Sequence, residues 1–508
     1  MTADICVIIE STYPYVRGGV SNWLHALISN LPELTFCVAN IGGSSEPQRP
    51  LKFTLPANVV TFYELNAFDA SWTQQRRRRR SASQHTAHIW EQLREFHDGM
   101  VHGRPSGGME LMQCLGLGAS HSGDIAAPDL FFAPEAWELL VSLYELHASS
   151  SSFVDFLWTF RASHLPLFSL LQSSLPRARV YHAVSSGFNG FAGALASMRT
   201  GAPLIVTEHG ISTREREIEI AQAEWIYEAE ETPLDLSRRF SHFQEWWLNM
   251  FRFMTKVTYD YAAAIISITG HNQRYQLRDG ADPAKMLIIP NGVDIERYRR
   301  AQDETPAAAG DRFVVGFVGR VVPIKDVKTY VRAIQIASRA IPGLTSYVIG
   351  PMEEDPEYAD ECQQLVEWLG LSDIIHFTGP ADVGEYYRKM DVLVLTSISE
   401  AQPLVILEAN CAGVPVVATE VGGCRELLMG ITPEDEAIGE SGILTPSVSP
   451  QETANAIIQL WRDPALRRRM ARAGLERAQR FYREEAVYDA YRAVYSKYLA
   501  ASPIAGEG

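Results

Sequence analysis

Short, nearly continuous apolar runs alternate with stretches of helical periodicity along most of this chain. In the N-terminal half, the runs at residues 5–9, 179–183, 203–207 and 264–268 predict buried strands, and residues 20–30 predict an amphipathic helix after the first of them. Strands that are apolar on both faces and separated by helices are typical of a parallel sheet covered by helices on both sides. The pattern therefore predicts an α/β fold.

A second set of the same kind begins at residue 313. Its predicted strands are 313–318, 346–349, 374–377, 392–395 and 415–418, and its predicted helices are 328–340, 357–369 and 404–411. A chain of 508 residues is too long for one core, and the small, polar stretch 301–310 indicates a linker. We expect two domains, 1–305 and 306–482, and a C-terminal helix within 483–508 that packs back toward the first.

Residues 66–175 interrupt this rhythm and predict an insertion into the first domain. The insertion contains five consecutive arginines, Arg76 to Arg80, which are more typical of a solvated helix face than of a docking site. Aromatic residues recur at near-helical spacing over 240–253. This spacing favours core or partner packing over a stacking platform for sugar rings.

Composition narrows the function classes. The formal net charge of −16 disfavours nonspecific nucleic-acid binding. The apolar runs fall far short of the roughly 20 residues that a membrane span needs, and the first ten residues predict a strand instead of a signal peptide. Six cysteines without a C-x-x-C pair indicate neither a disulfide framework nor a zinc site. We expect a cytoplasmic protein without a bound metal.

Two cations and two carboxylates in the second domain suit a nucleotide sugar. Arg320 and Lys325 follow the first strand of that domain, where fixed positive charge stabilises a diphosphate leaving group. Glu400 and Glu408 suit hydroxyl groups. If the chain turns helical at Pro403, eight residues at 1.5 Å each span about 12 Å, the separation of a hexose from a ribose across a diphosphate. Taken singly, each of these residues also fits an ordinary surface charge.

Further candidates lie at predicted strand ends, where parallel sheets bind ligands. Gly18 and Gly19 come between the first strand and the first helix, and a tight turn explains them equally well. His209 follows the strand at 203–207. Asn291 lies in a Pro-Asn-Gly-Val-Asp turn (290–294) whose polar side chains also suit local hydrogen bonds. A further glycine pair, at 422 and 423, repeats the sequence of strand followed by glycine.

The order of these motifs resembles the retaining nucleotide-sugar glycosyltransferases of the glycogen-synthase-like class, family four. The resemblance covers nearly the whole chain except the insertion, and it rests most on the Arg-Lys pair and the two glutamates eight positions apart. It implies the GT-B fold, in which two Rossmann-like domains face each other across a central cleft. Within the family, residues 13–23 and 31–36 are similar to the cytosolic glycosyltransferases of the bacterial Pel exopolysaccharide system.

The resemblance also implies site roles. Arg320 and Lys325 hold the donor diphosphate, Glu408 the ribose hydroxyls and Glu400 the hydroxyls of the transferred sugar. His209 lies near C6 and the reacting face. The remaining donor-binding positions implied are Gly18, Gly19, Asn291 and Leu404. Ala401-Gln402-Pro403 stands where many relatives have Gly or Phe, so the sequence does not predict the sugar.

The expected function is transfer of a sugar from a UDP-activated donor to a growing exopolysaccharide with retention and without a cofactor or metal. In such enzymes the leaving phosphate helps to deprotonate the acceptor. The expected partners are the UDP-sugar, a polysaccharide acceptor and inner-membrane synthase components that hold the protein at the membrane. Two alternatives remain open: a sugar-nucleotide epimerase, and a non-catalytic sugar-nucleotide-binding scaffold of a synthase complex.

Overall fold

The computed structural model describes residues 2–42, 49–68, 84–101, 129–149, 151–221, 223, 240–299 and 312–501. The chain forms two compact units. The N-terminal unit comprises residues 1–267, 273–287 and 492–508, and the C-terminal unit comprises 268–272 and 288–491. The units divide at 287/288 instead of 305 because the turn after residue 288 bonds to the C-terminal unit: the Val293 amide donates to the Tyr482 carbonyl at 2.8 Å.

The N-terminal unit is built on a seven-stranded sheet of order β3-β2-β1-β4-β5-β6-β7, with parallel pairing from β3 through to β6. The strands are β1 (Ala3–Glu10), β2 (Phe36–Gly42), β3 (Val59–Asn66), β4 (Ala178–Ala183), β5 (Leu204–Glu208), β6 (Ala262–Ser267) and β7 (Met286–Ile288). The connecting helices are α1 (Gly19–Ser29), α7 (Phe188–Thr200), α8 (Ser212–Ala221), α9 (His242–Tyr261) and α10 (Gly270–Arg278), followed by the short η3 (Pro283–Lys285). Asn66, the expected start of the insertion, is the last residue of β3.

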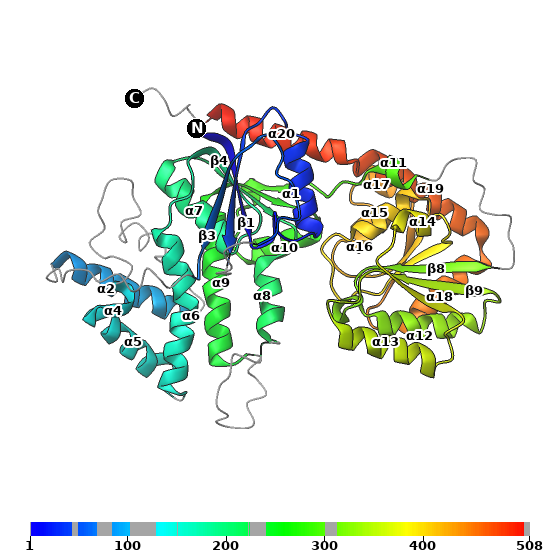
Figure 1. Cartoon of the computed structure of the whole chain (residues 1–508), viewed down its shortest axis with the longest axis horizontal. Coiled ribbons are helices and arrows are strands. Elements are labelled where there is room, and N and C mark those ends of the chain that lie inside the picture. Colours follow the sequence, from blue (N-terminus) through cyan, green and yellow to red (C-terminus); the bar gives the residue numbers. More distant parts are fainter. Residues whose placement is uncertain are drawn as a thin grey trace. The chain divides into compact units, whose positions relative to one another are not determined.

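The C-terminal unit is built on a six-stranded, all-parallel sheet of order β10-β9-β8-β11-β12-β13. Its strands are β8 (Phe313–Val318), β9 (Leu344–Ile349), β10 (Ile375–Gly379), β11 (Val392–Leu395), β12 (Val416–Thr419) and β13 (Gly442–Thr445). Its helices are α11 (Ile295–Tyr298), η4 (Pro323–Lys325), α12 (Val327–Ser338), α13 (Pro356–Trp368), α14 (Val383–Tyr387), α15 (Leu404–Cys411), α16 (Cys424–Met429), α17 (Pro433–Glu436), α18 (Pro450–Arg462) and α19 (Pro464–Phe481). Figure 1 shows helices on both faces of this sheet. The predicted α/β class with two parallel sheets is confirmed.

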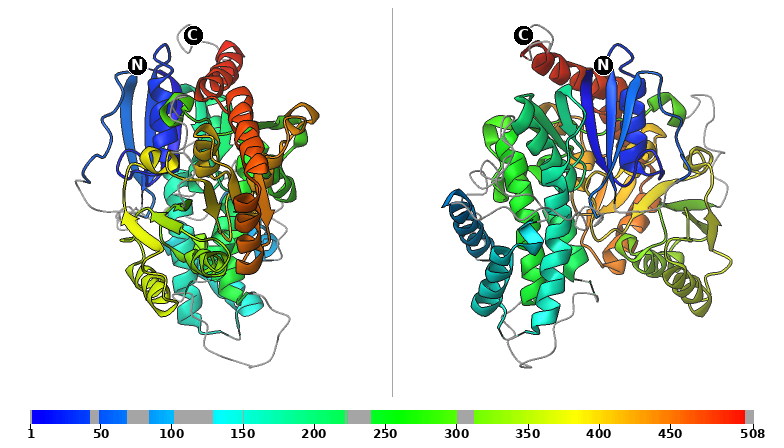
Figure 2. Two further views of the ribbon diagram at one scale, coloured as in Figure 1. Left: turned by 90° about the vertical axis from the view of Figure 1, so that its right-hand side faces the viewer. Right: turned by 60° about the vertical axis from the view of Figure 1, so that its left-hand side comes forward.

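Between β3 and β4 the chain forms a group of helices beside the N-terminal sheet (Figures 1 and 2). The helices are α2 (Gln84–Val101), α4 (Asp129–Phe132), α5 (Pro134–His147) and α6 (Phe153–Gln172). Of these, α2 and α6 pack on α9, where Phe96 and Phe253 meet at a ring-centroid distance of 4.6 Å and Trp246 is 2% exposed. The prediction that the aromatic stretch 240–253 packs in a core is therefore confirmed. Arg76 to Arg80 lie outside the described residues.

The last helix, α20 (Glu484–Ala501), is shared between the units, since residues up to Tyr491 belong to the C-terminal unit and those from Arg492 onward to the N-terminal unit. In the N-terminal unit, the Arg492 Nε donates to Glu33 Oε1 at 2.7 Å, and the Tyr498 hydroxyl donates to the Ala263 carbonyl at 2.8 Å. These bonds attach α20 to the loop between α1 and β2 and to β6.

Candidate functional site

Each sheet has a topological switch point, where neighbouring strands connect outward in opposite directions. In the C-terminal unit the switch lies between β8 and β11, and in the N-terminal unit between β1 and β4. Loops at the carboxyl ends of such strands form a crevice that binds ligands in open parallel sheets. Gly319-Arg320 follow β8 and Ser397 to Glu400 follow β11, so the predicted cations and the first glutamate share one switch point.

The two predicted cations occupy different environments. Arg320 has a half-exposed side chain that pairs with Glu354. Lys325 ends the short helix η4, and only 18% of its side chain is exposed. The Thr396 hydroxyl, at the end of β11, donates to the Lys325 carbonyl at 3.1 Å. This bond ties the lysine loop to the neighbouring strand and holds Lys325 at the switch point.

Glu400 lies in direct contact with Lys325. The Lys325 Nζ pairs with Glu400 Oε1, the same oxygen accepts a hydrogen bond from the Ser397 hydroxyl at 2.6 Å, and the glutamate side chain is 11% exposed. A cation beside a carboxylate at one strand edge can hold a phosphate and an adjacent hydroxyl of one ligand. The structure thus brings together two residues that lie 75 positions apart.

The glycine pair after β12 supports the Glu400 loop. Gly422 has φ +53, and a Cβ on it would lie 1.7 Å from the Glu400 carbonyl oxygen. The Gly423 amide donates to the Ala401 carbonyl at 2.8 Å. Only glycine combines this positive φ with so close an approach to neighbouring backbone.

Glu408 lies inside α15 and its carboxylate is largely buried. The Tyr387 hydroxyl donates to Glu408 Oε2 at 2.9 Å, and the Tyr298 hydroxyl also bonds to this carboxyl. Burial raises the pKa of Glu408, while the two tyrosine hydroxyls act in the opposite direction. Neither tyrosine was predicted, because each lies far from Glu408 in sequence and only the fold brings them together.

The helix predicted at 404–411 is confirmed as α15, and it begins directly after Pro403. Pro403 is the N-cap and Leu404 the first helical residue of α15, so Glu400 lies outside the helix. The estimate of about 12 Å between the two glutamates assumed a continuous helical rise from position 400. Because only residues 404 to 408 are helical, that estimate is wrong in its premise, although both side chains remain in the same unit.

The turn containing Asn291 is joined to the Glu400 loop by Gln402. The Asn291 amide donates to Gln402 Oε1 at 2.7 Å. In the same turn, Asp294 caps α11 by accepting from the Arg297 amide at 3.1 Å, as expected for a local hydrogen bond. Gln402 is therefore the residue of the unusual Ala401-Gln402-Pro403 segment that contacts a predicted donor-binding position.

In the N-terminal unit, Gly18 and Gly19 begin α1 at the carboxyl end of β1. Gly18 is the N-cap and Gly19 the first helical residue. A Cβ at either position would have no atom within 4 Å, and both residues are exposed. The first amide groups of α1 are therefore open to a ligand, and an anion is favoured at a helix N-terminus.

His209 follows β5 and packs against α1. Its ring centroid lies 4.4 Å from that of Trp23 in an edge-on arrangement. Burial lowers the pKa of His209 to about 4, so the imidazole is neutral at pH 7. The same helix thus carries the glycine pair at its start and the aromatic neighbour of His209 one turn later.

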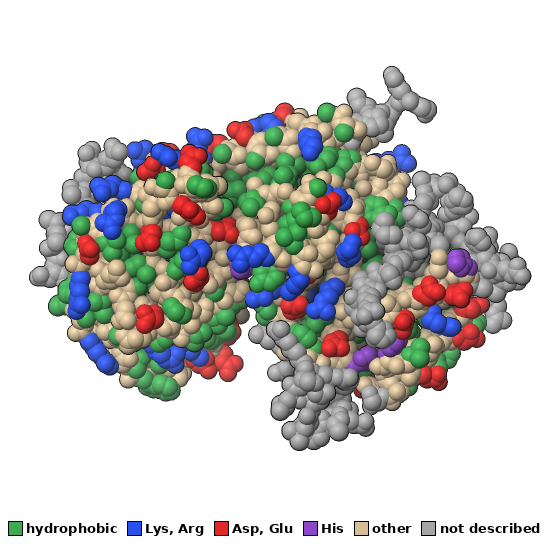
Figure 3. Space-filling view, turned by 180° about the vertical axis from the view of Figure 1, so that it is seen from behind, with side chains coloured by type: hydrophobic (Ala, Val, Ile, Leu, Met, Phe, Trp, Pro, Cys, Tyr) green, Lys and Arg blue, Asp and Glu red, His purple; other side chains and the backbone are tan. Residues whose placement is uncertain are grey.

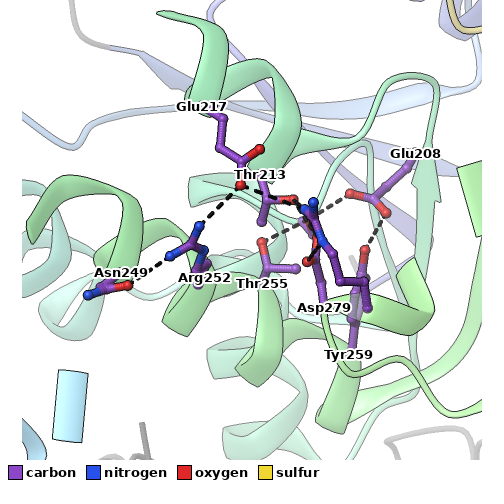
Figure 4. A network of polar contacts seen from close by, with 10 residues as sticks. Glu208, Thr213, Glu217, Asn249, Arg252, Thr255, Tyr259 and Asp279 are labelled. Atoms are coloured by element: carbon purple, nitrogen blue, oxygen red, sulfur yellow. Dashed lines mark hydrogen bonds and ion pairs between the residues drawn. The ribbon is translucent and has the colours of Figure 1, made fainter. Parts of the chain in front are cut away.

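The residue before His209 anchors the end of β5. Glu208 is fully buried and accepts hydrogen bonds from the Ser186 hydroxyl at 2.6 Å and the Tyr259 hydroxyl at 2.5 Å. Burial raises its pKa, and the hydrogen bonds oppose that effect. Figure 4 shows Glu208 and Tyr259 turned toward one another beside the pair of Thr213 and Asp279. This network fixes the strand end from which His209 projects.

On the face that Figure 3 shows, basic and acidic side chains are interspersed. Within the part of the chain that the structure describes, no group of three or more His, Cys, Asp and Glu side chains is placed to hold a metal ion. No helix among those residues is long and apolar enough to cross a membrane.

Two family models match the chain. Residues 3–284 match the family described as "Domain of unknown function (DUF3492)", and residues 312–463 match "Glycosyl transferases group 1". The first match covers more than half of the chain. The second covers the switch point of the C-terminal sheet, including Arg320, Lys325, Glu400 and Glu408.

Curated relatives share part of the sequence. The chain is 33% identical over 243 residues to a D-inositol 3-phosphate glycosyltransferase of Kineococcus radiotolerans, covering 43% of this chain and 55% of that protein. It is 31% identical over 215 residues to the protein of the same name from Streptomyces bingchenggensis, covering 40% and 46%. The chain thus matches about half the length of these relatives.

Solved structures share the fold over nearly the whole chain. Anabaena Alr3699/HepE, in complex with UDP, superposes with a TM-score of 0.58 at 17% identity, covering 97% of this chain and 100% of that one. Sucrose-phosphate synthase from Thermosynechococcus elongatus also gives 0.58 at 19% identity, covering 98% and 100%. With two Rossmann-like units of seven and six strands, the fold is GT-B.

Proposed function

The chain belongs to the DUF3492 family, and from this membership and its group 1 glycosyl transferase match we propose that it transfers a sugar from a UDP-activated donor to a polysaccharide acceptor. The observation that carries the proposal is the contact between Lys325 and Glu400 at the switch point of the C-terminal sheet. A nucleotide sugar presents a diphosphate next to hydroxyl groups, which is the combination that this pair suits.

Each site residue has a role in the proposal. Arg320 and Lys325 bind the diphosphate and stabilise the negative charge that grows on it as the sugar leaves. Glu400 accepts from hydroxyls of the transferred sugar, and Glu408 accepts from the ribose. The open α1 amides at Gly18 and Gly19 and the neutral imidazole of His209 suit the phosphate and the polar groups of the sugar, respectively.

We propose retention at the anomeric carbon and no requirement for a metal. The acceptor hydroxyl attacks the anomeric carbon on the face from which UDP departs. The bond between that carbon and the diphosphate oxygen breaks, and the acceptor proton passes to the leaving phosphate. Arg320 and Lys325 supply the positive charge for this step.

The proposed acceptor is a growing exopolysaccharide, and the proposed system is Pel-like. The support is the resemblance of residues 13–23 and 31–36 to the PelF group of glycosyltransferases. In this proposal the protein works in the cytoplasm, at the inner membrane, through other components of the synthase.

A ligand screen followed by a turnover assay tests the proposal. Thermal shifts are measured with UDP-, GDP- and ADP-sugars, where a hundredfold excess over Kd stabilises a protein by about 2.7 kcal/mol. UDP release is then followed with and without oligosaccharide acceptors. A shift with a UDP-sugar and acceptor-dependent release support the proposal. Interconversion of donor epimers without acceptor would instead identify an epimerase, and binding without turnover a scaffold.

A further inference from the structure

We propose that Ser397 and Gly422 are positioning residues that orient Glu400 toward the sugar of the donor. This inference rests on the proposed function, since it concerns how the same site is built. Ser397 lies two residues after β11 and Gly422 three residues after β12, so the ends of two adjacent strands supply the two supports. Neither residue is proposed to bind the donor itself.

The first support acts on the carboxylate. Glu400 Oε1 accepts from the Ser397 hydroxyl at 2.6 Å and pairs with the Lys325 Nζ. Glu400 Oε1 therefore already has two partners within the protein. Among the described residues no hydrogen bond to Oε2 accompanies them, so Oε2 is the oxygen left to accept from a sugar hydroxyl.

Ser397 is itself held in place by a hydrogen bond from the neighbouring strand, β12. The Thr419 hydroxyl, at the end of β12, donates to the Ser397 carbonyl at 2.6 Å, and both residues are fully buried. This bond holds the Ser397 backbone, since a buried carbonyl that loses its hydrogen-bond donor is left unpaired at a cost. The serine therefore acts as a fixed donor to Glu400.

The second support acts on the backbone. Gly422 lies against the Glu400 carbonyl so closely that a Cβ would fall 1.7 Å from the oxygen, and Gly423 would meet the Ala401 carbonyl at 2.7 Å. Since backbone atoms cannot swing aside as a flexible side chain does, any larger residue at 422 moves the Glu400 loop. The position of Glu400 is thus held twice, by the Ser397 hydrogen bond to its carboxylate and by the packing of Gly422 against its backbone.

The consequence is a separation between nucleotide binding and sugar handling. The Ser397 hydroxyl donates to the carboxylate proposed to meet the sugar, and among the described residues no hydrogen bond joins Ser397 to Arg320 or Glu408. Loss of the serine hydroxyl should therefore leave UDP binding unchanged and weaken only what depends on Glu400. A purely structural serine would lower UDP affinity and stability together with turnover.

Calorimetric titration of Ser397→Ala, Ser397→Thr and a control tests the inference. The control is Ser441→Ala, which removes another fully buried serine hydroxyl of the same unit that bonds to the Leu428 carbonyl at 3.3 Å. The ligands are UDP and the UDP-sugar that gives the wild type its largest thermal shift. Turnover is measured in parallel with the same UDP-sugar.

Ser397→Ala should bind UDP within about twofold of wild type and lose about tenfold in kcat, the effect of one hydrogen bond to a charged group. Ser397→Thr should recover most of the loss because it keeps a hydroxyl, and Ser441→Ala should retain kcat. Gly422→Ala should repeat the Ser397→Ala pattern. Wild-type turnover in Ser397→Ala, or an equal loss of UDP affinity, would overturn the inference alone. A wild type that binds no UDP-sugar would overturn the proposed function and, with it, the inference.

Discussion

Lys325 and Glu400 form the ion pair on which the proposed chemistry depends. Both side chains are mostly buried, and they meet at the edge where β8 and β11 end. A cation held in this way is already oriented before a phosphate arrives, so little reorganisation is needed as charge develops on the leaving group. Arg320, by contrast, is half exposed and free to move from Glu354 onto a phosphate.

Replacing Arg320 or Lys325 by Ala should weaken binding of UDP itself. Each side chain is proposed to make a charge-assisted hydrogen bond to the diphosphate, worth about 1.5–3 kcal/mol, which corresponds to roughly a tenfold to hundredfold rise in Kd. Isothermal calorimetry with UDP checks this. Lys328→Ala, which removes a lysine paired with Glu361 on α13, is the matched control and should bind as wild type. Unchanged UDP affinity in both site variants would show that Arg320 and Lys325 do not bind the diphosphate.

Substitutions of Glu400 and Glu408 should affect UDP affinity and kcat differently. Glu408→Gln should weaken UDP and UDP-sugar alike, since its proposed contact is with the ribose. Glu400→Gln should leave UDP affinity nearly intact and lower kcat, because its contact is made only with a sugar and matters most in the transition state. Calorimetry and steady-state kinetics measure both effects. Equal losses of UDP affinity would refute the division of roles.

At the scale of elements, the loops that carry the site are held by close backbone packing between strand ends. Gly350, after β9, has φ +148, and a Cβ on it would lie 2.1 Å from the Gly319 carbonyl oxygen. Gly319 is the residue before Arg320. The backbone that follows β9 therefore fixes the position of the backbone just before Arg320.

Gly350→Ala should reduce UDP affinity without removing any proposed ligand group, because the new methyl displaces the backbone next to Arg320. Calorimetry with UDP measures the loss, and we expect it to approach that of Arg320→Ala. Gly370→Ala is the control, since this glycine also has a positive φ, +67, yet a Cβ there would have no atom within 4 Å. Equal UDP affinity in the two variants would show that β9 does not position the arginine.

The insertion helices are joined by a buried polar chain. The Trp246 indole donates to the Ser163 hydroxyl at 3.0 Å, this oxygen lies 3.0 Å from His164 Nδ1, and the Nε2 atoms of His164 and His97 are 2.9 Å apart. His97 Nδ1 completes the chain at the Leu93 carbonyl, 2.5 Å away. The Phe160 carbonyl also lies 2.9 Å from His164 Nδ1, so this nitrogen has two close partners.

The two buried histidines predict that the stability of the N-terminal unit falls at acidic pH. Burial lowers the pKa of His97 to about 4 and that of His164 well below its usual value, and the nearby His147, itself 3.3 Å from Asp98, acts in the same direction on His97. The folded state therefore binds fewer protons than the unfolded state between pH 6.5 and about 4. The stability that the pair contributes is present above pH 6.5 and is lost as pH falls through this window.

His97→Gln should lower the free energy of unfolding at pH 7 and reduce its dependence on pH between 6.5 and about 4. Chemical denaturation of wild type and variant across this range measures the difference. His376→Gln, which alters a histidine on the exposed part of β10, is the matched control and should keep the wild-type slope. A His97→Gln slope equal to that of wild type would contradict the neutral chain.

At the scale of the whole molecule, the sequence predicts the architecture well where strands are buried on both faces. The runs at 313–318 and 392–395 match β8 and β11 without error, since parallel strands at the centre of a sheet are continuously apolar. β3 was missed because it lies at the edge of its sheet and its sequence, Val-Val-Thr-Phe-Tyr-Glu-Leu-Asn, mixes polar with apolar residues. Its neighbour β2 was missed with it.

The site was predictable only in part. Arg320, Lys325 and Glu400 lie in the loops that follow two predicted strands, and the carboxyl ends of parallel strands meet at one edge of a sheet. Ser397 carried a weak signal, a hydroxyl three residues before Glu400. Tyr298 and Tyr387 carried none, because their contact with Glu408 depends on how α11 and α14 pack on α15, which no local pattern encodes.

The anomeric configuration of the product made from a UDP-sugar tests the proposed reaction most directly. Wild-type protein is incubated with the UDP-sugar identified by thermal shift and an oligosaccharide acceptor, and the new linkage is observed by proton NMR while UDP release is followed. We predict acceptor-dependent UDP release, a product with the anomeric configuration of the donor, and loss of both in Lys325→Ala. An inverted product would contradict the retaining mechanism, and no transfer from any UDP-sugar that binds would contradict the assignment as a glycosyltransferase.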